Sequence, residues 1–123
     1  MIRTIDSYFE HGDPRGRIKG IINTGEWEEI NMITSDADVV RGNHYHKYTL
    51  ELFFIIRGEI KVHTQRVKDG KLCSKVAENI VREGDIFIVD PMVNHIFYTM
   101  TDSAWINVLS KRLDTYEPDM YRV

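Results

Sequence analysis

Cysteine and long apolar runs are both scarce in this sequence of 123 residues. The single cysteine, Cys73, excludes an intramolecular disulfide, which is typical of proteins in a reducing compartment. The longest apolar run, Leu52–Ile56, is far shorter than the ~18 residues that a membrane-spanning helix needs. The first 17 residues contain no continuous apolar stretch of the kind found in signal peptides. These absences predict a cytoplasmic protein without a membrane span.

An excess of positive charge, the usual footprint of a nucleic-acid-binding protein, is also missing. The net charge is −3 and the isoelectric point is near 5.9. Basic residues are scattered, and the densest cluster, Lys61–Lys71, is interleaved with apolar positions as in a solvated hairpin. The sequence also lacks a glycine-rich dinucleotide-binding fingerprint, which argues against a reductase. We therefore expect no nucleic-acid partner and a small-molecule ligand instead.

The sequence is rich in short β-compatible segments that are separated by turn signals. No segment shows the apolar spacing of an amphipathic helix. Many short strands with a turn at roughly every eight to twelve residues are typical of a β-sandwich or β-barrel. We therefore predict one all-β domain over residues 1–123. The predicted strands are Trp27–Ile33, Leu52–Ile56, Ile60–Gln65, Ile86–Val89, His95–Met100 and Ala104–Leu109.

Three features are specific enough to predict how the chain runs locally. Leu52–Ile56 is continuously apolar, as expected for a strand that is buried on both faces. Apolar and polar residues alternate from Ile60 to Gln65, so this strand should have one buried face and one exposed face. The pair Asp69-Gly70 predicts a tight hairpin, because both residues tolerate positive φ.

Two histidines are spaced so that an extended strand would direct them to one place. Residues two apart point to the same face of a strand, so His44 and His46 project side by side while Tyr45 points away. Glu51 lies five residues beyond His46, an odd offset that would put it on the opposite face of an unbroken strand. A site shared by these side chains therefore requires a bend within residues 47–50.

The segment HYHKYTLELFFIIRG resembles the first of the two sequence motifs of the cupin family. It reads as His-x-His, four residues, Glu, six residues and Gly, and it ends at Gly58. The second cupin motif opens with a glycine and has a histidine eleven residues later, which is the separation of Gly84 and His95. The resemblance covers about residues 27–110. It implies a cupin-type double-stranded β-helix, a jelly-roll barrel with short N-terminal and C-terminal extensions.

The chain departs from the cupin pattern at four positions, none of which is a ligand position in the family. Asp38 stands where the family has a glycine, and Pro91 lies one residue late. Met92 and Thr99 replace a glycine and an asparagine. These departures bear on the turns of the barrel more than on the site.

By this resemblance, His44, His46, Glu51 and His95 would bind one divalent metal ion. Imidazole and carboxylate ligands suit zinc, iron, manganese and nickel alike, so the residue types do not choose the metal. The alternative is a polar cluster in which the same four side chains hold one another by hydrogen bonds without metal.

The flanking string RGNHYHK, Arg41–Lys47, resembles two groups of sugar-nucleotide enzymes. In the deoxysugar 3,4-ketoisomerases, a similar string carries two histidines that move protons without metal, and a glutamine stands at the position of Glu51. The cupin domain of capsule-biosynthesis sugar-nucleotide epimerase/reductases has the glutamate. Because Glu51 and His95 complete a four-ligand set, the resemblance favours a metal-binding cupin that isomerises or epimerises a carbohydrate or nucleotide sugar.

Such chemistry removes a proton next to a ketone, and the enediolate oxygen then needs a metal ion or a fixed hydrogen-bond donor. Without metal, His44 and His46 would carry the protons, because the pKa of histidine lies near physiological pH. If both histidines bind the ion, Tyr48 and Tyr98 are the candidate proton carriers. Two other functions stay open: a metal-dependent oxygenase of a small organic acid, and a non-catalytic protein that binds a metabolite.

Further residues have candidate roles around this site. Arg41 would either pair with a phosphate or carboxylate of the ligand or form a structural salt bridge. Met1–Ile22 carries apolar positions without obvious partners, so we expect a homodimer that uses this segment. Four aromatic residues would line an apolar cup around the ion or pack in the core: Phe53, Phe87, Phe97 and Trp105.

Overall fold

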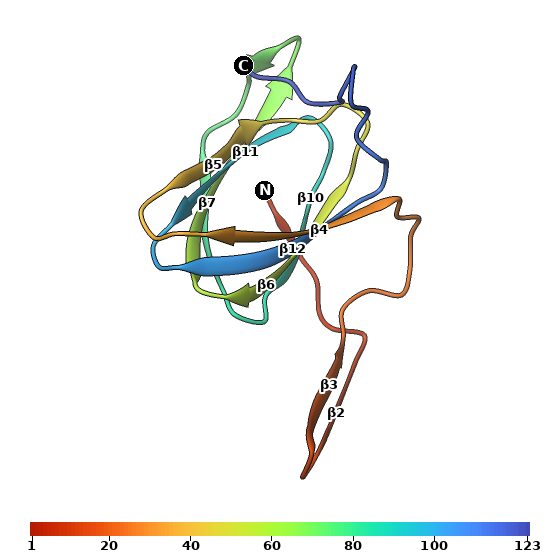
Figure 1. Ribbon diagram of the computed structural model, residues 1–123. Helices are drawn as coiled ribbons and strands as arrows, with labels where there is room; N and C mark the ends of the chain where they lie inside the picture. The colour runs from red at the N-terminus through yellow and green to blue at the C-terminus, as the bar shows by residue number, and fades with distance from the viewer.

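The computed structural model describes residues 1–123 and is all-β, as predicted. Two antiparallel sheets form a barrel (Figure 1). The first sheet has the strand order β1 (Arg3–Thr4), β10 (Ile86–Val89), β6 (Glu51–Arg57), β12 (Ser103–Leu109) and β4 (Glu29–Ser35). The second has the order β5 (Val40–His44), β11 (Val93–Thr99), β7 (Glu59–Lys68) and β8 (Lys71–Leu72), and β9 (Ala77–Arg82) also pairs with β7. The structure contains no helix that could span a membrane.

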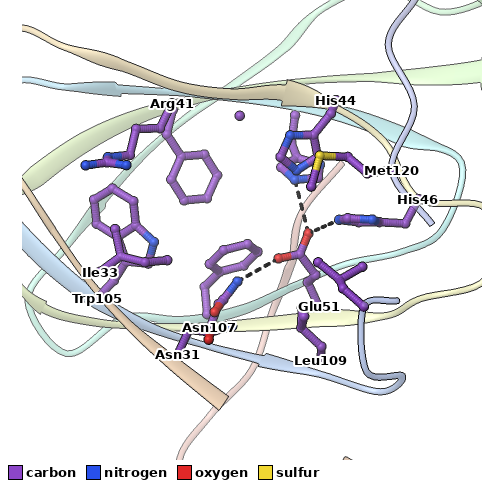
Figure 2. A pocket seen from close by; sticks show the side chains of 15 residues that line it. Asn31, Ile33, Arg41, His44, His46, Glu51, Trp105, Asn107, Leu109 and Met120 are labelled. Carbon is purple, nitrogen blue, oxygen red and sulfur yellow. Dashed lines mark hydrogen bonds and ion pairs between the residues drawn. The ribbon is translucent and has the colours of Figure 1, made fainter. Parts of the chain in front are cut away.

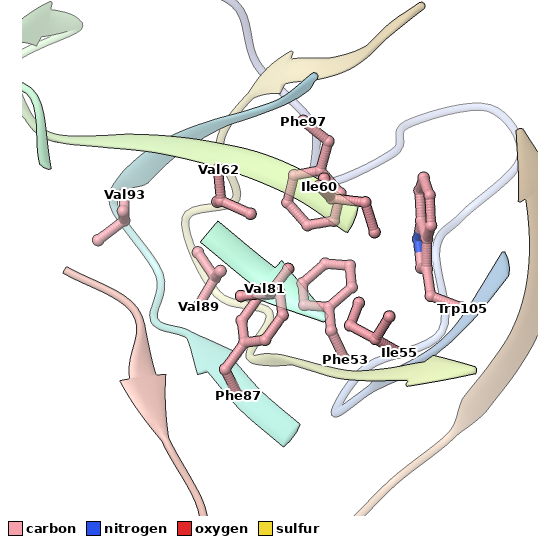
Figure 3. Close-up of a cluster of buried hydrophobic side chains, with 10 residues drawn as sticks. All are labelled: Phe53, Ile55, Ile60, Val62, Val81, Phe87, Val89, Val93, Phe97 and Trp105. Carbon is pink, nitrogen blue, oxygen red and sulfur yellow. The ribbon is translucent and has the colours of Figure 1, made fainter. Parts of the chain in front are cut away.

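The core lies inside the barrel, and it is built by alternate residues of the strands (Figure 3). Successive side chains of a strand point to opposite faces. In β7, for example, Ile60 and Val62 are fully buried, whereas Lys61 and His63 are partly exposed, as the alternation in the sequence predicts. The ten core residues are Phe53, Ile55, Ile60, Val62, Val81, Phe87, Val89, Val93, Phe97 and Trp105.

Strand β6 is buried on both faces, as its continuous apolar run predicts. Phe53 and Ile55 belong to the core of the barrel, whereas Leu52 packs in a second cluster on the other face of the sheet. Residues of the N-terminal segment cover this second cluster, and Trp27 is one of them. Trp27 lies outside β4, because this strand begins at Glu29, two residues later than predicted.

The turns between strands lie where the sequence places them. Asp69 and Gly70 join β7 to β8, and both have positive φ (52° and 74°). Gly58, with φ 98°, makes the turn between β6 and β7. Strand β11 begins at Val93, two residues before the predicted start, and β12 begins one residue early at Ser103.

The two extensions of the barrel differ from each other. Strand β1 pairs with β10 of the same chain and so joins the barrel. Strands β2 (Phe9–Asp13) and β3 (Gly16–Gly20), which the sequence does not predict, form a hairpin that projects away from the barrel at the bottom of Figure 1. We call residues 8–20 the N-terminal arm. The C-terminal segment, residues 110–123, returns to the barrel and pairs with Tyr45 through Tyr121.

Replacing Gly58 with alanine is expected to destabilise the protein far more than replacing Gly70. An added Cβ at Gly58 would overlap Ser103 Oγ and lie 2.7 Å from the carbonyl oxygen of Asp102, whereas nothing lies within 4 Å of a Cβ at Gly70. Gly70→Ala should therefore lower the free energy of unfolding by about 1 kcal/mol, the backbone penalty alone. Gly58→Ala should lower it by at least ~3 kcal/mol in urea denaturation. Equal losses would show that the β6–β7 turn relaxes freely.

Candidate functional site

Four side chains that the sequence singles out converge inside the barrel. Figure 2 labels three of them, His44, His46 and Glu51. His44 ends β5, His46 follows two residues later, Glu51 begins β6 and His95 lies in β11. Their ligand atoms all lie within 4.8 Å of one another. His46, Glu51 and His95 are buried, and His44 is half-buried.

Pairing between β5 and β11 places two of the three histidines. His44 and His95 are partners across these strands, and their rings lie 4.7 Å apart. Tyr45 turns away from the site, is buried, and packs its ring 5.5 Å from that of Tyr121. His44 and His46 thus lie on the same side of the chain, as their two-residue spacing predicts.

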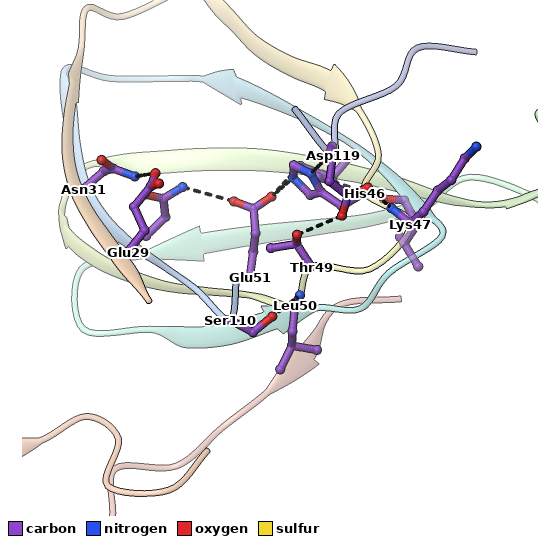
Figure 4. Close-up of polar contacts among 12 residues, drawn as sticks. Glu29, Asn31, His46, Lys47, Thr49, Leu50, Glu51, Ser110 and Asp119 are labelled. Carbon is purple, nitrogen blue, oxygen red and sulfur yellow. Dashed lines mark hydrogen bonds and ion pairs between the residues drawn. The ribbon is translucent and has the colours of Figure 1, made fainter. Parts of the chain in front are cut away.

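The bend that the odd offset of Glu51 requires is present. Residues 47–50 leave the strand conformation before β6 begins at Glu51. Two hydrogen bonds hold the end of this bend, because the N–H of Leu50 donates to Ser110 Oγ (2.8 Å) and the N–H of Ser110 donates to the Leu50 carbonyl (2.9 Å) (Figure 4). The bend changes the face of the chain, and the Glu51 carboxylate points back to the histidines.

Both oxygens of the Glu51 carboxylate have partners, although the side chain is only 3% exposed. Oε1 lies 2.5 Å from His46 Nε2 and 3.2 Å from His95 Nε2. Oε2 accepts a hydrogen bond of 3.0 Å from the side-chain amide of Asn107 on β12. One oxygen therefore faces the histidines while the other is held by an uncharged donor.

Main-chain carbonyls fix the rings of His46 and His95. His46 Nδ1 lies 2.5 Å from the carbonyl oxygen of Asp119, and His95 Nδ1 lies 3.1 Å from that of Val93. Because a carbonyl oxygen only accepts, each Nδ1 carries the proton and donates. Each ring consequently directs Nε2 at Glu51.

Burial and mutual contact shift the pKa values of this cluster in different directions. Burial alone would raise the pKa of Glu51, but the contacts with His46 and His95 outweigh it and hold that pKa well below its usual range. Burial alone would lower the pKa of His46, but the contact with Glu51 raises it above its ordinary value. Burial, helped by the nearby His95 and His46, lowers the pKa of His44 to about 4. At neutral pH, Glu51 is a carboxylate and His44 a neutral imidazole.

The donor set fits a divalent metal ion. Zinc binds imidazole nitrogen and carboxylate oxygen at about 2.0–2.2 Å, so a single ion can reach four ligand atoms as close together as these. A metal-binding histidine commonly donates its other N–H to a carbonyl, which is what His46 and His95 do. With Nδ1 protonated, a neutral ring would turn the lone pair of Nε2 toward Glu51 Oε1. Either a proton on Nε2, which the raised pKa of His46 favours, or a metal ion in its place would remove that repulsion.

A cavity of about 220 Å³ opens over the cluster. Polar groups of Asn31, Arg41 and Asn107 face it from the barrel wall, and Trp105 supplies an aromatic surface (Figure 2). Its apolar residues come from the strands and from the C-terminal segment. They are Ile33, Phe53, Phe97, Trp105, Leu109, Leu113 and Met120.

Arg41 forms no salt bridge, contrary to one of the two roles that the sequence leaves open. Its guanidinium donates to Ser35 Oγ (3.0 Å) and to the carbonyl of Thr34 (3.1 Å). It lines both the cavity and an adjoining polar pocket that also contains Arg57, Asp36 and Asp102. The Arg41 guanidinium thus makes its side-chain hydrogen bonds to uncharged oxygens and forms no ion pair with the carboxylates of this pocket.

The structure does not bring the two candidate tyrosines to the cavity. Tyr48 is 67% exposed, and Tyr98 lies on the outer side of β11, where its ring packs 5.0 Å from that of His63. Of the four aromatic residues expected at the site, Phe87 alone does not line the cavity and stacks on Phe53 in the core instead.

Several lining residues carry a weak signal or none in the sequence. Asn107 alternates with Trp105 and Leu109 on β12, so the period of the strand places it on the same face. Leu113 and Met120 lie in the polar C-terminal segment, where no periodicity points to the cavity. Nothing in the sequence indicates that Asp119 is a partner of His46, because the two residues are 73 positions apart.

Solved structures show the fold that the sequence predicts, the jelly-roll barrel of the cupins. The capsular polysaccharide assembling protein CapF from Staphylococcus aureus is 21% identical with a TM-score of 0.70, over 94% of this chain and 34% of CapF. This chain therefore spans about a third of the length of CapF. QdtA, a sugar 3,4-ketoisomerase from Thermoanaerobacterium thermosaccharolyticum in complex with TDP, is 17% identical with a TM-score of 0.77, over 99% and 88% of the two chains. The dTDP-4-dehydrorhamnose 3,5-epimerase from Sulfolobus tokodaii is 20% identical with a TM-score of 0.78, over 93% and 72%.

Sequence comparison identifies the family. No curated protein sequence is detectably similar to this chain. Residues 11–121, however, match the family described as the polysaccharide biosynthesis C-terminal domain. The match includes both cupin motifs, the four clustered side chains and most of the C-terminal segment. The chain belongs to the polysaccharide biosynthesis C-terminal domain family.

Proposed function

We propose that the chain binds one divalent metal ion through His44, His46, Glu51 and His95, and that it isomerises or epimerises a carbohydrate or nucleotide sugar there. The observation that carries this proposal is the buried Glu51 carboxylate, which contacts Nε2 of two histidines whose Nδ1 atoms are already used. A buried centre of this kind on the wall of a cavity suits a cation and the transfer of protons.

The bound ion would draw charge from a carbonyl oxygen and stabilise the negative charge that develops when the neighbouring carbon loses a proton. We assign the proton transfer to His44, released from the ion and leaving it to His46, Glu51 and His95, because an imidazole that binds a metal has no lone pair free to accept a proton. His44 is the most exposed histidine of the cluster, and neither of its ring nitrogens has a hydrogen-bond partner in the protein. Its ring is free to turn toward a ligand, whereas carbonyls fix the rings of His46 and His95.

The cavity suits a ligand of about one sugar ring. Its volume of about 220 Å³ is below the ~300–1,000 Å³ of pockets that enclose drug-sized ligands. Asn31 and Asn107 offer amide groups to hydroxyls, and Trp105 offers an aromatic face to the carbons of the ring. Arg41, without a carboxylate partner, can attract a negatively charged substituent.

The names of the structural neighbours support a sugar ligand. QdtA is a sugar 3,4-ketoisomerase, and the Sulfolobus tokodaii protein is a dTDP-4-dehydrorhamnose 3,5-epimerase. Both names describe rearrangement of a sugar that carries a keto group. We extend this chemical class, a nucleotide-linked keto sugar, to the present chain as part of the proposal.

We also propose that the protein is a homodimer that uses its N-terminal arm. Tyr8, Phe9 and Ile18 of the arm are exposed by 51%, 44% and 59%, and a two-stranded hairpin is marginally stable by itself. Strand β4, at the edge of the first sheet, exposes Ile30 and Met32 by 67% and 65%. Packing the arm of one copy on β4 of the other would bury both apolar surfaces.

Protein purified without added metal is expected to contain about one divalent ion per chain, and Glu51→Gln should lose most of it, because the charged ligand is gone. Mass spectrometry of the metal content measures both. Glu78→Gln is the matched control, since Glu78 pairs with His63 outside the cavity. A wild-type protein that stays metal-free after incubation with zinc, iron, manganese and nickel salts would contradict the metal site and favour metal-free proton transfer by His44 and His46.

Wild-type protein should exchange a carbon-bound hydrogen of TDP-4-keto-6-deoxyglucose, the sugar present in one QdtA structure, when incubated in D2O. Deuterium should appear next to the ketone, as measured by NMR of the recovered sugar. His44→Gln should slow the exchange by about 100-fold or more, the usual contribution of a general base, and should retain more metal than Glu51→Gln. Unchanged exchange in His44→Gln would show that another group moves the proton.

Sedimentation at micromolar concentration should give a dimer for the wild type and a monomer for Phe9→Asp/Ile18→Asp, because each aspartate places a charge in the proposed interface. Val76→Asp changes an equally exposed residue of the barrel and should remain dimeric. A monomeric wild type, or a dimer that survives both arm substitutions, would rule out the arm as the contact.

A further inference from the structure

The C-terminal segment is bound to the chain around the first two histidines. Tyr45 and Tyr121 exchange two main-chain hydrogen bonds of 2.9 and 3.0 Å. Arg122 donates to the main-chain carbonyls of Gly42 and Asn43 at 3.4 and 3.0 Å. Met120 immediately precedes these two anchors and lines the cavity. The C-terminal segment is therefore hydrogen-bonded to the main chain immediately before and after His44.

Asp119 makes the densest set of contacts in this segment. Its carboxylate accepts hydrogen bonds from the N–H of Lys47 (2.8 Å), the N–H of Tyr48 (2.9 Å) and the hydroxyl of Thr49 (2.8 Å) (Figure 4). Burial alone would raise the pKa of Asp119, but these donors outweigh it and hold that pKa below its ordinary value. All three donors belong to residues 47–50, the bend that separates His46 from Glu51.

The main chain of the same residue contacts the site directly. The carbonyl oxygen of Asp119 lies 2.5 Å from His46 Nδ1. This contact keeps the proton on Nδ1 and directs Nε2 at Glu51 Oε1. One residue thus fixes both the ring of His46 and the bend that returns Glu51 to it.

We propose that Asp119 is a positioning residue of the site: its carboxylate fixes the bend at residues 47–50, and this places its own carbonyl to hold the His46 ring with Nε2 toward the centre. The part of this proposal that concerns the tautomer and orientation of His46 does not depend on a bound metal ion. The consequence for metal affinity rests on the proposed function, because it requires that His46 and Glu51 bind the ion.

The experiment compares Asp119→Ala with Asp114→Ala in two measurements. Asp114 is the matched control, because it is an exposed carboxylate of the same segment that accepts hydrogen bonds only from the N–H groups of Tyr116 and Glu117. In metal-free protein, ¹⁵N-edited NMR detects the hydrogen-bonded Nδ1–H of His46, assigned by its loss in His46→Gln. In the second measurement, zinc affinity is determined by competition with a chelator.

The wild type and Asp114→Ala should show the protected Nδ1–H signal and the same zinc affinity. Asp119→Ala should lose the signal by exchange with water and bind zinc about 10- to 100-fold more weakly, the usual effect of removing an outer partner of a metal-binding histidine. Asp119→Asn, which keeps the shape and one acceptor oxygen, should lie between them. If Asp119→Ala does not fold, the signal and affinity of Asp119→Asn decide.

The failures of the two proposals are distinguishable. A protected Nδ1–H and wild-type zinc affinity in a folded Asp119 variant would overturn the positioning role while leaving the metal site intact. A wild type that binds no zinc or other divalent ion would overturn the proposed metal site. In that case the NMR signal of His46, which requires no metal, still tests Asp119.

Discussion

A carboxylate buried inside an apolar barrel is the constraint on which the rest of this structure depends. Glu51 is 3% exposed, and moving an unpaired carboxylate out of water costs several kcal/mol even after the protein relaxes. Its partners come from three places: His46 just beyond β5, His95 on β11 and Asn107 on β12. Strands β5 and β11 belong to one sheet, and β6 and β12 to the other. The carboxylate is therefore satisfied only when both sheets are in their native register, since a slip of one residue would turn a partner to the opposite face.

Local rules of strand geometry predicted part of the site, and the part they missed depends on distant residues. The two-residue spacing correctly placed His44 and His46 together, because that relation is a property of any extended chain. The same rule showed that Glu51 needs a bend but could not say what stabilises it. The partner is Asp119, in a polar segment whose composition resembles a solvent-exposed tail. Contacts over such a separation follow from the closure of the barrel and have no local signature.

The sequence predicted the fold best where a local pattern of residues is compatible with only one conformation. Asp69 and Gly70 adopt the positive φ that a tight hairpin requires, and the apolar run of β6 is buried on both faces. The N-terminal arm was not predicted, because its strands bury almost nothing and so lack an alternating pattern. Residue type alone makes Tyr48 and Tyr98 candidate proton carriers. In the folded barrel both side chains lie outside the cavity. Whether a side chain points into the barrel or out of it depends on where its strand begins and bends, which residue type does not indicate.

The contacts that satisfy Glu51 also divide the cluster into fixed and free groups. Main-chain carbonyls hold His46 and His95, and Asn107 holds the second carboxylate oxygen, so the geometry of these groups is set before any ligand arrives. His44 has no such partner, although it lies in the same centre. A site needs fixed groups to bind an ion without reorganisation and a mobile group to exchange protons with a ligand. Strand pairing places His95 and Asn107, and the Asp119 carbonyl holds His46 beyond the end of β5, whereas the ring of His44 has no hydrogen-bond partner.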